Sequence, residues 1–519
     1  MKQGSLTAVG TGFLVAGQVT PETIASMRAA DELFFLVSEP ATRLWLENQF
    51  PSVQSLHDVF WEGRPRQDAY DEIVERLLAS VRRGRNVCAA FYGHPGVFVH
   101  SSHEAIRRAR AEGFAARMLP GVSAEDCLFA DLEVDPAADG CQSFEATDFL
   151  IRGRVFDPHS ALVLWQMGAL GVTTYHLHEL WNAAGLAILV AELCRVYPPD
   201  HPAVIYEATH YPVCAPLIQR TTIAGIPGCQ VNTHSTLWVP PIGRTPAARS
   251  PEPDSKRDRG RLTVVGTGYN VAGQVTPETL SCLKGAERLF YLMSDPATTS
   301  WLKGLNPTAE SLHDCYRVGE PGIEACGRMV ERILAAVREG SEVCAAFYGH
   351  PAIYIPPGLE SLRRARQEGF PARMLPAISF EDCLFADLGV DPGVHGRVLC
   401  EATSFLASPR GFDSTADLIL IQVGAIGLAN FQTGDWPNRE GLRRLAGALG
   451  ERYPESHRVA LYRISQLPIF ESSIDWVTVA ELPDAPLSVF STLYVPPLPR
   501  RPVDKEMLAR LREAVGSSR

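Results

Sequence analysis

Short apolar runs alternate along this chain with segments whose apolar residues recur at helical spacing. The runs that have the length and composition of buried strands are Leu6–Val9, Leu33–Val37 and Asn86–Tyr92. Between and after them, residues 71–81 and 103–111 predict helices, the first with Val74, Leu77, Leu78 and Val81 on one face. Strands separated by helices predict an α/β fold with mainly parallel, helix-covered sheets, in which ligands bind beyond the carboxyl ends of the strands.

The whole pattern occurs twice in the chain. VGTG at residue 9 recurs at residue 265, FYGHP at 91 recurs at 347, EAT at 145 recurs at 401, and VPP at 239 recurs at 495. Every pair is offset by 256 positions, so almost no net insertion or deletion separates the two copies. A period of this length is a whole domain rather than one unit of a solenoid, and each copy is expected to have its own core.

We therefore expect a first domain over residues 5–244 and a second over residues 260–500. Residues 245–259 are rich in Pro, Ser, Arg and Asp, which indicates an exposed linker. Residues 501–519 form a tail, in which Met507, Leu508, Leu511 and Ala514 are spaced for one face of an amphipathic helix.

Composition narrows the class of protein. The chain of 519 residues has 46% hydrophobic and 21% charged residues, a balance typical of soluble globular proteins. Its formal net charge of -11 argues against a nucleic acid as the main partner. No apolar run reaches the length of a membrane span and no signal peptide begins the sequence, so a cytoplasmic location is expected. The 12 cysteines include no CxxC pair and no Cys/His cluster at zinc spacing, which predicts no metal site. Six recur at matched places in or beside apolar segments, which predicts buried thiols: Cys88 with Cys344, Cys127 with Cys383, and Cys141 near Cys400.

Three glycine-containing turns follow predicted strands. Gly10-Thr11-Gly12 alone is weak evidence, because it lacks the lysine of a phosphate-binding loop and the third glycine of a dinucleotide fingerprint. Residues 92–98 (YGHPGVF) are either a turn with a capping histidine or a cofactor loop whose last two residues pack on an apolar part of the ligand. Residues 120–126 (PGVSAED) allow Ser123 to cap a helix, which is compatible with ligand binding.

In their order along the chain, GTG, YGHPGVF, MLPGVSAEDCLFADL, FEATDFL, LWQMG and STLWVPP resemble the tetrapyrrole methylases, and within that class the borosin peptide-backbone N-methyltransferases. The likeness covers each copy nearly from end to end. It implies two tandem tetrapyrrole-methylase-like domains, each bilobal, with S-adenosyl-L-methionine (SAM) bound between the lobes. The positions that the resemblance assigns to the cofactor are Tyr92, His94, Gly96, Val97, Phe98, Ser123, Ala124, Gln166 and Thr236.

The resemblance also implies the catalytic residues. A neutral backbone amide is a poor nucleophile, and the family's arginine and tyrosines are expected to stabilise an imidate-like oxyanion and relay the proton. Arg66 and Tyr70 match the arginine and the last tyrosine, whereas His57 and Phe60 stand where the family has tyrosines. This departure leaves room for a different acceptor or for His57 as the base. Without the resemblance, Arg66 would be assigned as a solvated surface charge.

The second copy differs at these positions. Gly322 and Cys326 replace the candidate arginine and tyrosine, and Ala352 and Ala377 replace glycines of two ligand turns. An added methyl group is expected to clash with a ligand, or to strain a turn that needs a positive φ. We therefore expect one active site, in the first copy, with a degenerate second copy as its partner. The opposite assignment stays open, because Tyr316 keeps a family tyrosine that the first copy lacks.

Three functions remain open. The first is SAM-dependent N-methylation of backbone amides in a peptide supplied in trans, because the tail is short and charged and has no apolar core-peptide stretch. The second is methylation of a small molecule, a tetrapyrrole or another biosynthetic intermediate, which the changed tyrosines favour. The third is a non-catalytic scaffold, which the retained residues of the first copy oppose. The tandem chain is expected to fold as an internal pseudodimer, monomeric as a single chain, with no nucleic acid and no membrane as partner.

Overall fold

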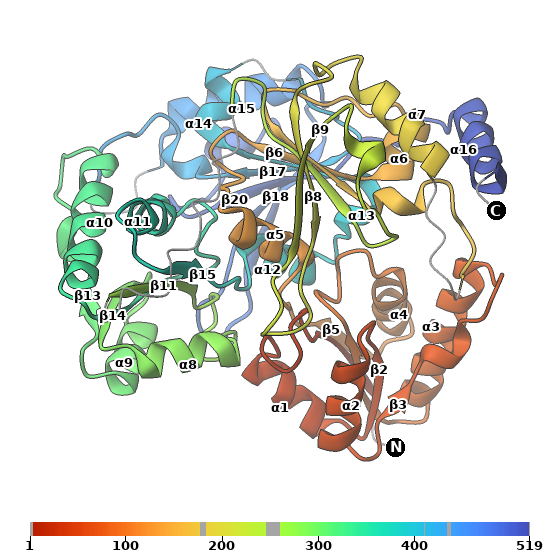
Figure 1. The fold of residues 1–519 in the computed structure, drawn as a ribbon, viewed down its shortest axis with the longest axis horizontal. Coiled ribbons are helices and arrows are strands. Elements are labelled where there is room, and N and C mark those ends of the chain that lie inside the picture. The colour runs from red at the N-terminus through yellow and green to blue at the C-terminus, as the bar shows by residue number, and fades with distance from the viewer. Residues whose placement is uncertain (1–3, 177–182, 245–259, 409–410, 433–436, 518–519) are drawn as a thin grey trace.

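The computed structural model describes residues 4–176, 183–244, 260–408, 411–432 and 437–517. Each copy has an N-terminal and a C-terminal lobe, and the C-terminal lobes of the two copies lie together in the upper half of the view in Figure 1. The predicted linker, residues 245–259, lies outside the described residues.

The N-terminal lobes are five-stranded parallel sheets of identical topology, with strand orders β3-β2-β4-β1-β5 and β13-β12-β14-β11-β15. In the first copy the elements are β1 (Ser5–Gly10), α1 (Pro21–Ala29), β2 (Glu32–Leu36), α2 (Pro40–Gln49), β3 (Gln54–Ser55), α3 (Arg66–Arg82), β4 (Asn86–Phe91), α4 (His100–Ala111) and β5 (Ala115–Met118). In the second copy they are β11 (Arg261–Gly266), α8 (Pro277–Gly285), β12 (Arg288–Leu292), α9 (Pro296–Leu305), β13 (Glu310–Ser311), α10 (Gly322–Arg338), β14 (Glu342–Phe347), α11 (Pro356–Gln367) and β15 (Ala372–Met374). The predicted strands and helices are confirmed, and the α/β fold with them.

The C-terminal lobes share one ten-stranded sheet, with the order β19-β18-β20-β17-β16-β6-β7-β10-β8-β9. The first copy contributes α5 (Ala124–Leu132), β6 (Cys141–Glu145), α6 (Ala146–Ile151), β7 (Ala161–Trp165), α7 (Ala183–Leu193), β8 (Pro202–Glu207), β9 (Leu217–Thr222) and β10 (Thr236–Val239). The second contributes α12 (Phe380–Leu388), α13 (Pro392–His395), β16 (Arg397–Glu401), α14 (Ala402–Ala407), β17 (Asp417–Ile421), α15 (Arg439–Gly450), β18 (Arg458–Arg463), β19 (Ser473–Thr478) and β20 (Thr492–Val495).

The two halves of this sheet meet at β6 and β16, which pair antiparallel with Gln142 opposite Val398. These two residues are equivalent positions of the repeat, so a pseudo-twofold axis passes between them. Apart from β6–β7 and β16–β17, the strand pairs of this sheet are antiparallel. The expected mainly parallel arrangement therefore describes the N-terminal lobes but not the shared sheet, where hairpins such as β8–β9 need no crossover helix.

The hydrophobic cores follow the same division. Separate clusters lie in the N-terminal lobes, one around Val9 and Phe35 and another around Val265 and Tyr291. In the C-terminal lobes the largest cluster contains residues of both copies, and two further clusters also combine residues of the two copies. The prediction that each copy has its own core is therefore wrong for these lobes, because pairing β6 with β16 removes the edge that each half-sheet would otherwise expose.

The last helix, α16 (Lys505–Ser517), returns from the second copy to the first. It packs on α7 and α6, and Figure 1 shows it beside α7. Met507 and Leu511 are buried in the shared core, and an added methyl group at Gly171 would lie 3.0 Å from Leu511 Cβ. The predicted amphipathic helix is confirmed.

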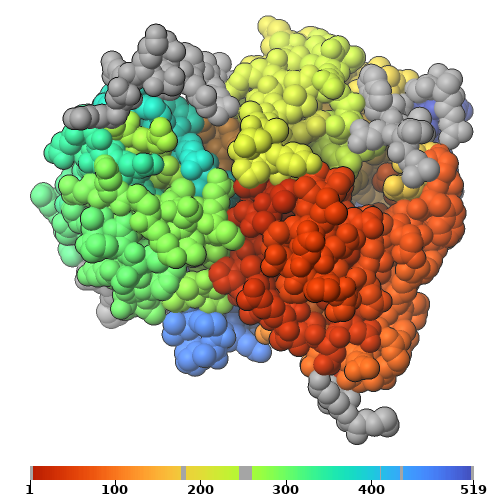
Figure 2. Space-filling model, turned by 60° about the horizontal axis from the view of Figure 1, so that its bottom comes forward, coloured from red at the N-terminus to blue at the C-terminus, as the bar shows by residue number. Residues whose placement is uncertain are grey.

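The N-terminal lobes also touch each other, and Figure 2 shows the red lobe of the first copy against the green lobe of the second. The N–H of Glu22 donates to the Gly273 oxygen at 3.1 Å, and the N–H of Glu278 donates to the Gly17 oxygen at 3.2 Å. The two hydrogen bonds are equivalent under the 256-residue offset. The internal pseudodimer is thus nearly symmetric in both pairs of lobes.

Candidate functional site

A cavity of about 410 Å³ lies in the first copy at the carboxyl ends of β2 and β4. The residues that line it are Leu36, Val37, Ser38, His57, Phe60, Arg66, Tyr70, Phe91, Tyr92, Phe98, Val99, His100, Ser101, Gln166, Val172, Tyr175, His176, Thr233 and His234. Its size is typical of small-molecule sites, and its position is the one where α/β sheets bind ligands.

The structure brings the three candidate catalytic residues, His57, Arg66 and Tyr70, to this cavity. Arg66 is the first residue of α3, which starts directly after Pro65, and its N–H donates to the Thr173 oxygen at 3.2 Å. Tyr70 follows four residues later, so both side chains lie on the same face of the helix.

Tyr70 is partly buried beside aromatic rings. Its ring centroid lies 6.2 Å from that of Phe60 and 6.1 Å from that of His100. Burial raises the pKa of Tyr70, and the positive charge of Arg66 opposes this rise. Within the described ranges the Arg66 guanidinium forms no ion pair. A cation and a phenol on one cavity wall suit the stabilisation of an oxyanion and the relay of a proton.

His57 uses both of its ring nitrogens within the protein. Its Nε2 donates to the Val37 oxygen, and its Nδ1 accepts from Ser55 Oγ at 2.9 Å. Burial lowers the pKa of His57, which keeps the ring neutral. Neither nitrogen is free to take a proton from an acceptor, so the geometry favours Tyr70 over His57 for proton transfer.

Three of the expected cofactor residues, Tyr92, Phe98 and Gln166, line the same cavity. Phe98 and Gln166 have left-handed backbones, with φ of 58° and 55°. A left-handed backbone is costly for non-glycine residues and persists where the surrounding structure holds it. The residue that holds the Phe98 backbone belongs to the other copy, because the Phe98 N–H donates to Asp391 Oδ1 at 2.9 Å.

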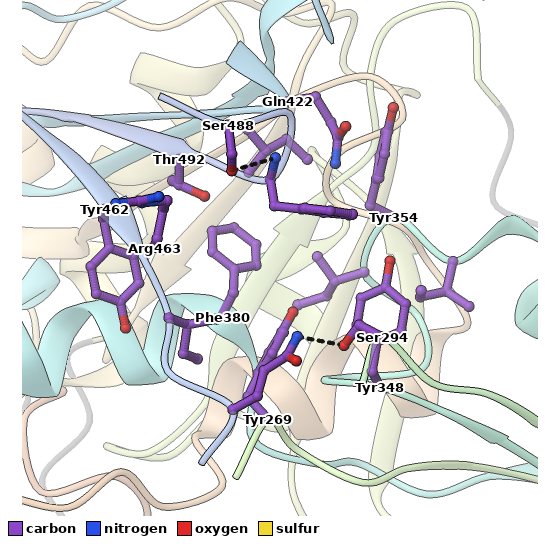
Figure 3. Close-up of a pocket in the computed structure, with 16 residues that line it drawn as sticks. Tyr269, Ser294, Tyr348, Tyr354, Phe380, Gln422, Tyr462, Arg463, Ser488 and Thr492 are labelled. Carbon is purple, nitrogen blue, oxygen red and sulfur yellow. Dashed lines mark hydrogen bonds between the residues drawn. The ribbon is translucent and has the colours of Figure 1, made fainter. Parts of the chain in front are cut away.

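Three further expected residues, Val97, Ala124 and Thr236, do not line the 410 Å³ cavity, but their equivalents line a cavity in the second copy. This second cavity has a volume of about 280 Å³ (Figure 3). Its lining residues are Tyr269, Ser294, Tyr348, Ile353, Tyr354, Ile355, Phe380, Ile421, Gln422, Tyr462, Arg463, Ile464, Gln466, Ser488, Phe490 and Thr492. The equivalents of Tyr92, Phe98 and Gln166 line it too, so the two cavities sample overlapping parts of one repeated site.

The remaining expected residues, His94, Gly96 and Ser123, line neither cavity. His94 Nε2 donates to the backbone oxygen of Asp382 at 2.9 Å, and its Nδ1 accepts from the Gly96 N–H at 2.9 Å. Ser123 forms a capping box with Asp126 at the start of α5. These residues therefore hold the turns in place, and His94 ties its turn to the second copy.

The glycines at positions 96 and 121 face protein rather than ligand. A methyl group at Gly96 would meet Met118 Sδ at 2.6 Å, and one at Gly121 would meet Gly10 Cα at 2.8 Å. Neither glycine has a positive φ. Their replacements Ala352 and Ala377 are buried and do not line the second cavity. The expected clash of these two alanines with a ligand is therefore wrong, because their methyl groups point into the core.

The aromatic rings near the candidate catalytic residues are arranged differently in the second copy. Tyr316 stacks on Phe431 with ring centroids 4.7 Å apart and an interplanar angle of 25°. In the first copy the equivalent rings, Phe60 and Tyr175, are tilted at 43° and line the open cavity. With Gly322 and Cys326 at the positions equivalent to Arg66 and Tyr70, the second copy lacks the candidate proton-transfer groups of the first.

Sequence reasoning did not identify the charged cluster on the pseudo-twofold axis. Arg397 is 0% exposed and forms ion pairs with Glu125 at 2.7 Å and Glu381 at 2.9 Å. The only signal in the sequence is that the two copies differ at this position, where the first copy has Cys141 and the second has Arg397. Burial raises the pKa of Glu381 to about 8, although Arg397 opposes the rise.

The described residues contain neither a candidate metal site nor a membrane-spanning helix. No group of His, Cys, Asp and Glu side chains is placed to hold a metal ion. The helices found there are all too short or too polar to cross a bilayer. The six cysteines expected to be buried thiols (Cys88, Cys127, Cys141, Cys344, Cys383 and Cys400) are all buried and free.

Residues 5–212 and 261–463 each match the family model of tetrapyrrole (corrin/porphyrin) methylases. The chain is 41% identical over 247 residues to the methyltransferase/ribosomally synthesized cyclic peptide dendrothelin A precursor of Dendrothele bispora, and 40% identical over 247 residues to the omphalotin A precursor of Omphalotus olearius. Each match covers 47% of this chain and 59% of the relative, so the chain spans about three fifths of these relatives. A uroporphyrin-III C-methyltransferase structure from Thermus thermophilus matches with 19% identity and a TM-score of 0.34, covering 46% of this chain and 92% of that one.

Proposed function

Because the chain belongs to the tetrapyrrole methylase family, we propose that it transfers methyl groups from SAM to backbone amides of a peptide, in the cavity of its first copy. The observation that carries this proposal is that one cavity collects Arg66, Tyr70, Tyr92, Phe98 and Gln166. The names of the peptide-precursor methyltransferases that the chain resembles support the acceptor class.

The lining of the cavity fits SAM. The rings of Tyr92 and Phe98 offer aromatic faces to a sulfonium, and Gln166 offers an amide for hydrogen bonding. When bound, SAM supplies a methyl group that a nitrogen can attack directly, with the thioether as the leaving group. No metal is required for such a transfer.

The chain's own residues would act on the acceptor amide. Arg66 places a positive charge where the amide oxygen gains electron density as its nitrogen loses a proton. Because burial raises its pKa, Tyr70 stays protonated near neutral pH, so its hydroxyl relays the amide proton by accepting it and releasing its own to solvent water. His57 holds the wall of the site through Ser55 and Val37.

The acceptor is proposed to be a separate molecule. The described tail residues form α16, whose apolar face is buried in the shared core away from the cavity lining. The second copy acts as a built-in partner, and the single chain is the functional unit. Light scattering that gives a dimer of full chains would contradict that last point.

Incubation of the pure chain with methyl-labelled SAM and a panel of apolar peptides, followed by mass spectrometry, tests the proposal. Methyl groups on backbone nitrogens, lost in Tyr70→Phe, are expected. A small-molecule acceptor is the second candidate, favoured by Phe60 and His57 in place of two tyrosines. Label in a porphyrinogen and in no peptide would support that candidate and reject the peptide.

A further inference from the structure

The second copy keeps the backbone of the proposed cofactor site. Gln422 has φ 59° and ψ 30°, close to the 55° and 35° of Gln166 in the first copy. Ser379 caps α12 through the same kind of capping box that Ser123 forms at α5. The loop and the helix start that border the site therefore have the same geometry in both copies, and differences in ligand binding must come from side chains.

One side chain at this border differs greatly in size. The first residue of α5 is Ala124, whereas the first residue of α12 is Phe380. Since the capping boxes fix both helix starts, the phenyl ring extends from the place where the first copy has only a methyl group. Figure 3 shows the Phe380 ring among the side chains that line the second cavity, between Tyr462 on one side and Tyr354 on the other.

The ring is held in this position. Phe380 packs against two hydrophobic clusters, one built partly from the N-terminal lobe of the second copy and the other from the shared sheet. A ring packed on two sides has few other rotamers to adopt. It therefore remains part of the cavity wall and narrows the space that a ligand of the first copy would use.

We propose that Phe380 is the specificity-determining residue that excludes SAM from the second copy. This inference rests on the proposed function, because it takes the equivalent site of the first copy as the SAM site. The two alanines of the turns play no part, since their methyl groups face the core. The second copy is thus a methylase fold whose equivalent cavity, of about 280 Å³, is narrowed by one aromatic side chain.

Calorimetric titration of S-adenosylhomocysteine into the full chain tests the inference by counting sites. The wild-type chain is expected to bind at about one site per chain, and Phe380→Ala at about two. Phe380→Tyr keeps the bulk of the ring and is the matched control, with about one site expected. Ala124→Phe, which transfers the ring to the first copy, is expected to abolish binding.

The double variant Ala124→Phe/Phe380→Ala should bind at about one site again, now in the second copy. Thermal unfolding of each variant without ligand checks that the chain is folded, and Phe380→Leu replaces Phe380→Ala if the alanine variant is not. Two sites in the wild type, or an unchanged single site in a folded Phe380→Ala or Phe380→Leu chain, would overturn the inference and leave the proposed function intact. No binding to the wild type would reject the proposed function and the inference with it.

Discussion

The carboxylate of Asp391 accepts a hydrogen bond from the backbone N–H of Phe98 at 2.9 Å, across the boundary between the two copies. The equivalent bond joins Asp135 to the N–H of Tyr354 at 3.1 Å. Each aspartate therefore holds a left-handed residue in the cavity wall of the other copy. The second copy therefore helps to fix the shape of the first cavity, although the described residues that line this cavity all belong to the first copy.

Removal of this contact should weaken the first site. Asp391→Ala leaves the Phe98 N–H without its charged acceptor, and we expect the affinity for S-adenosylhomocysteine to fall about tenfold. Asp135→Ala is the matched control, because it removes the equivalent bond to Tyr354 beside the second cavity. Each aspartate also accepts a hydrogen bond from the N–H two residues later, so both variants lose two bonds. Equal affinity of both variants in calorimetric titration would show that the Asp391 contact does not shape the first site.

Proton relay through Tyr70 gives a second prediction. Tyr70→Phe should lower the rate of methyl transfer about 100-fold or more, because the amide proton loses its path, with little change in cofactor affinity. Cys326→Ala alters the equivalent position of the second copy and should leave the rate unchanged. The prediction fails if Tyr70→Phe methylates at the wild-type rate under single-turnover conditions.

Arg397 forms ion pairs with one glutamate from each copy, whereas the equivalent residue of the first copy is a cysteine. Moving the arginine to the other copy tests whether the two positions are interchangeable. Arg397→Cys leaves Glu125 and Glu381 buried without a cation, which should cost about 3–5 kcal/mol of unfolding free energy. Because Cys141 is the equivalent residue of the other copy, Cys141→Arg/Arg397→Cys should recover much of this loss. Chemical denaturation measures both variants. A double variant no more stable than Arg397→Cys would show that the two sides of the axis are not interchangeable.

The reciprocal histidine bonds predict a loss of stability rather than of cofactor contacts. His94 donates to the Asp382 oxygen and His350 donates to the Asp126 oxygen, at 2.9 and 3.0 Å. His94→Ala and His350→Ala should each destabilise the chain by about 1–3 kcal/mol, because a buried carbonyl loses its donor. Thermal unfolding without ligand should show similar losses for both. A stable His94→Ala chain that has lost S-adenosylhomocysteine binding would instead assign His94 to the cofactor.

The buried carboxyl group of Asp417 predicts that the folded chain becomes less stable as the pH rises. Burial raises the pKa of Asp417 to about 7, while its hydrogen bond from Tyr494 opposes the rise. The native state therefore holds a proton that the unfolded chain releases near its ordinary pKa of 3.8, so this group's stabilisation is complete below that pH and is lost as the pH rises to about 7. At about 1.4 kcal/mol per unit of pKa, the effect is a few kcal/mol.

Asp417→Asn removes this titration and keeps an acceptor for Tyr494. The variant should match the wild type in melting temperature near pH 4 and exceed it near pH 8. Comparison with the wild type is needed because burial lowers the pKa of His350 to about 3, which makes stability fall as the pH drops below the range of free histidine. Parallel pH profiles of the two proteins would show that Asp417 does not titrate in this range.

How far the site could be predicted depended on where each residue finds its partners. Arg66, Tyr70 and His57 are assigned by the resemblance to the family, and all three line one cavity whose listed residues belong to the first copy. The resemblance assigns His94 to the cofactor. In the structure its Nε2 donates to the backbone oxygen of Asp382, which lies 288 positions away in the other copy, and no local pattern predicts that contact.

The sequence by itself determined the elements and the duplication. Caps, periodic apolar faces and strand-length runs act over a few residues, and a constant offset of 256 positions reveals two copies without any contact between them. Only the tertiary structure decided that the copies share one sheet and one core, that Arg397 sits between two glutamates, and that the alanine methyls face inward while Phe380 borders a cavity. These facts depend on where side chains point and on what lies across a pseudo-twofold axis, and the spacing of residues along a chain carries neither.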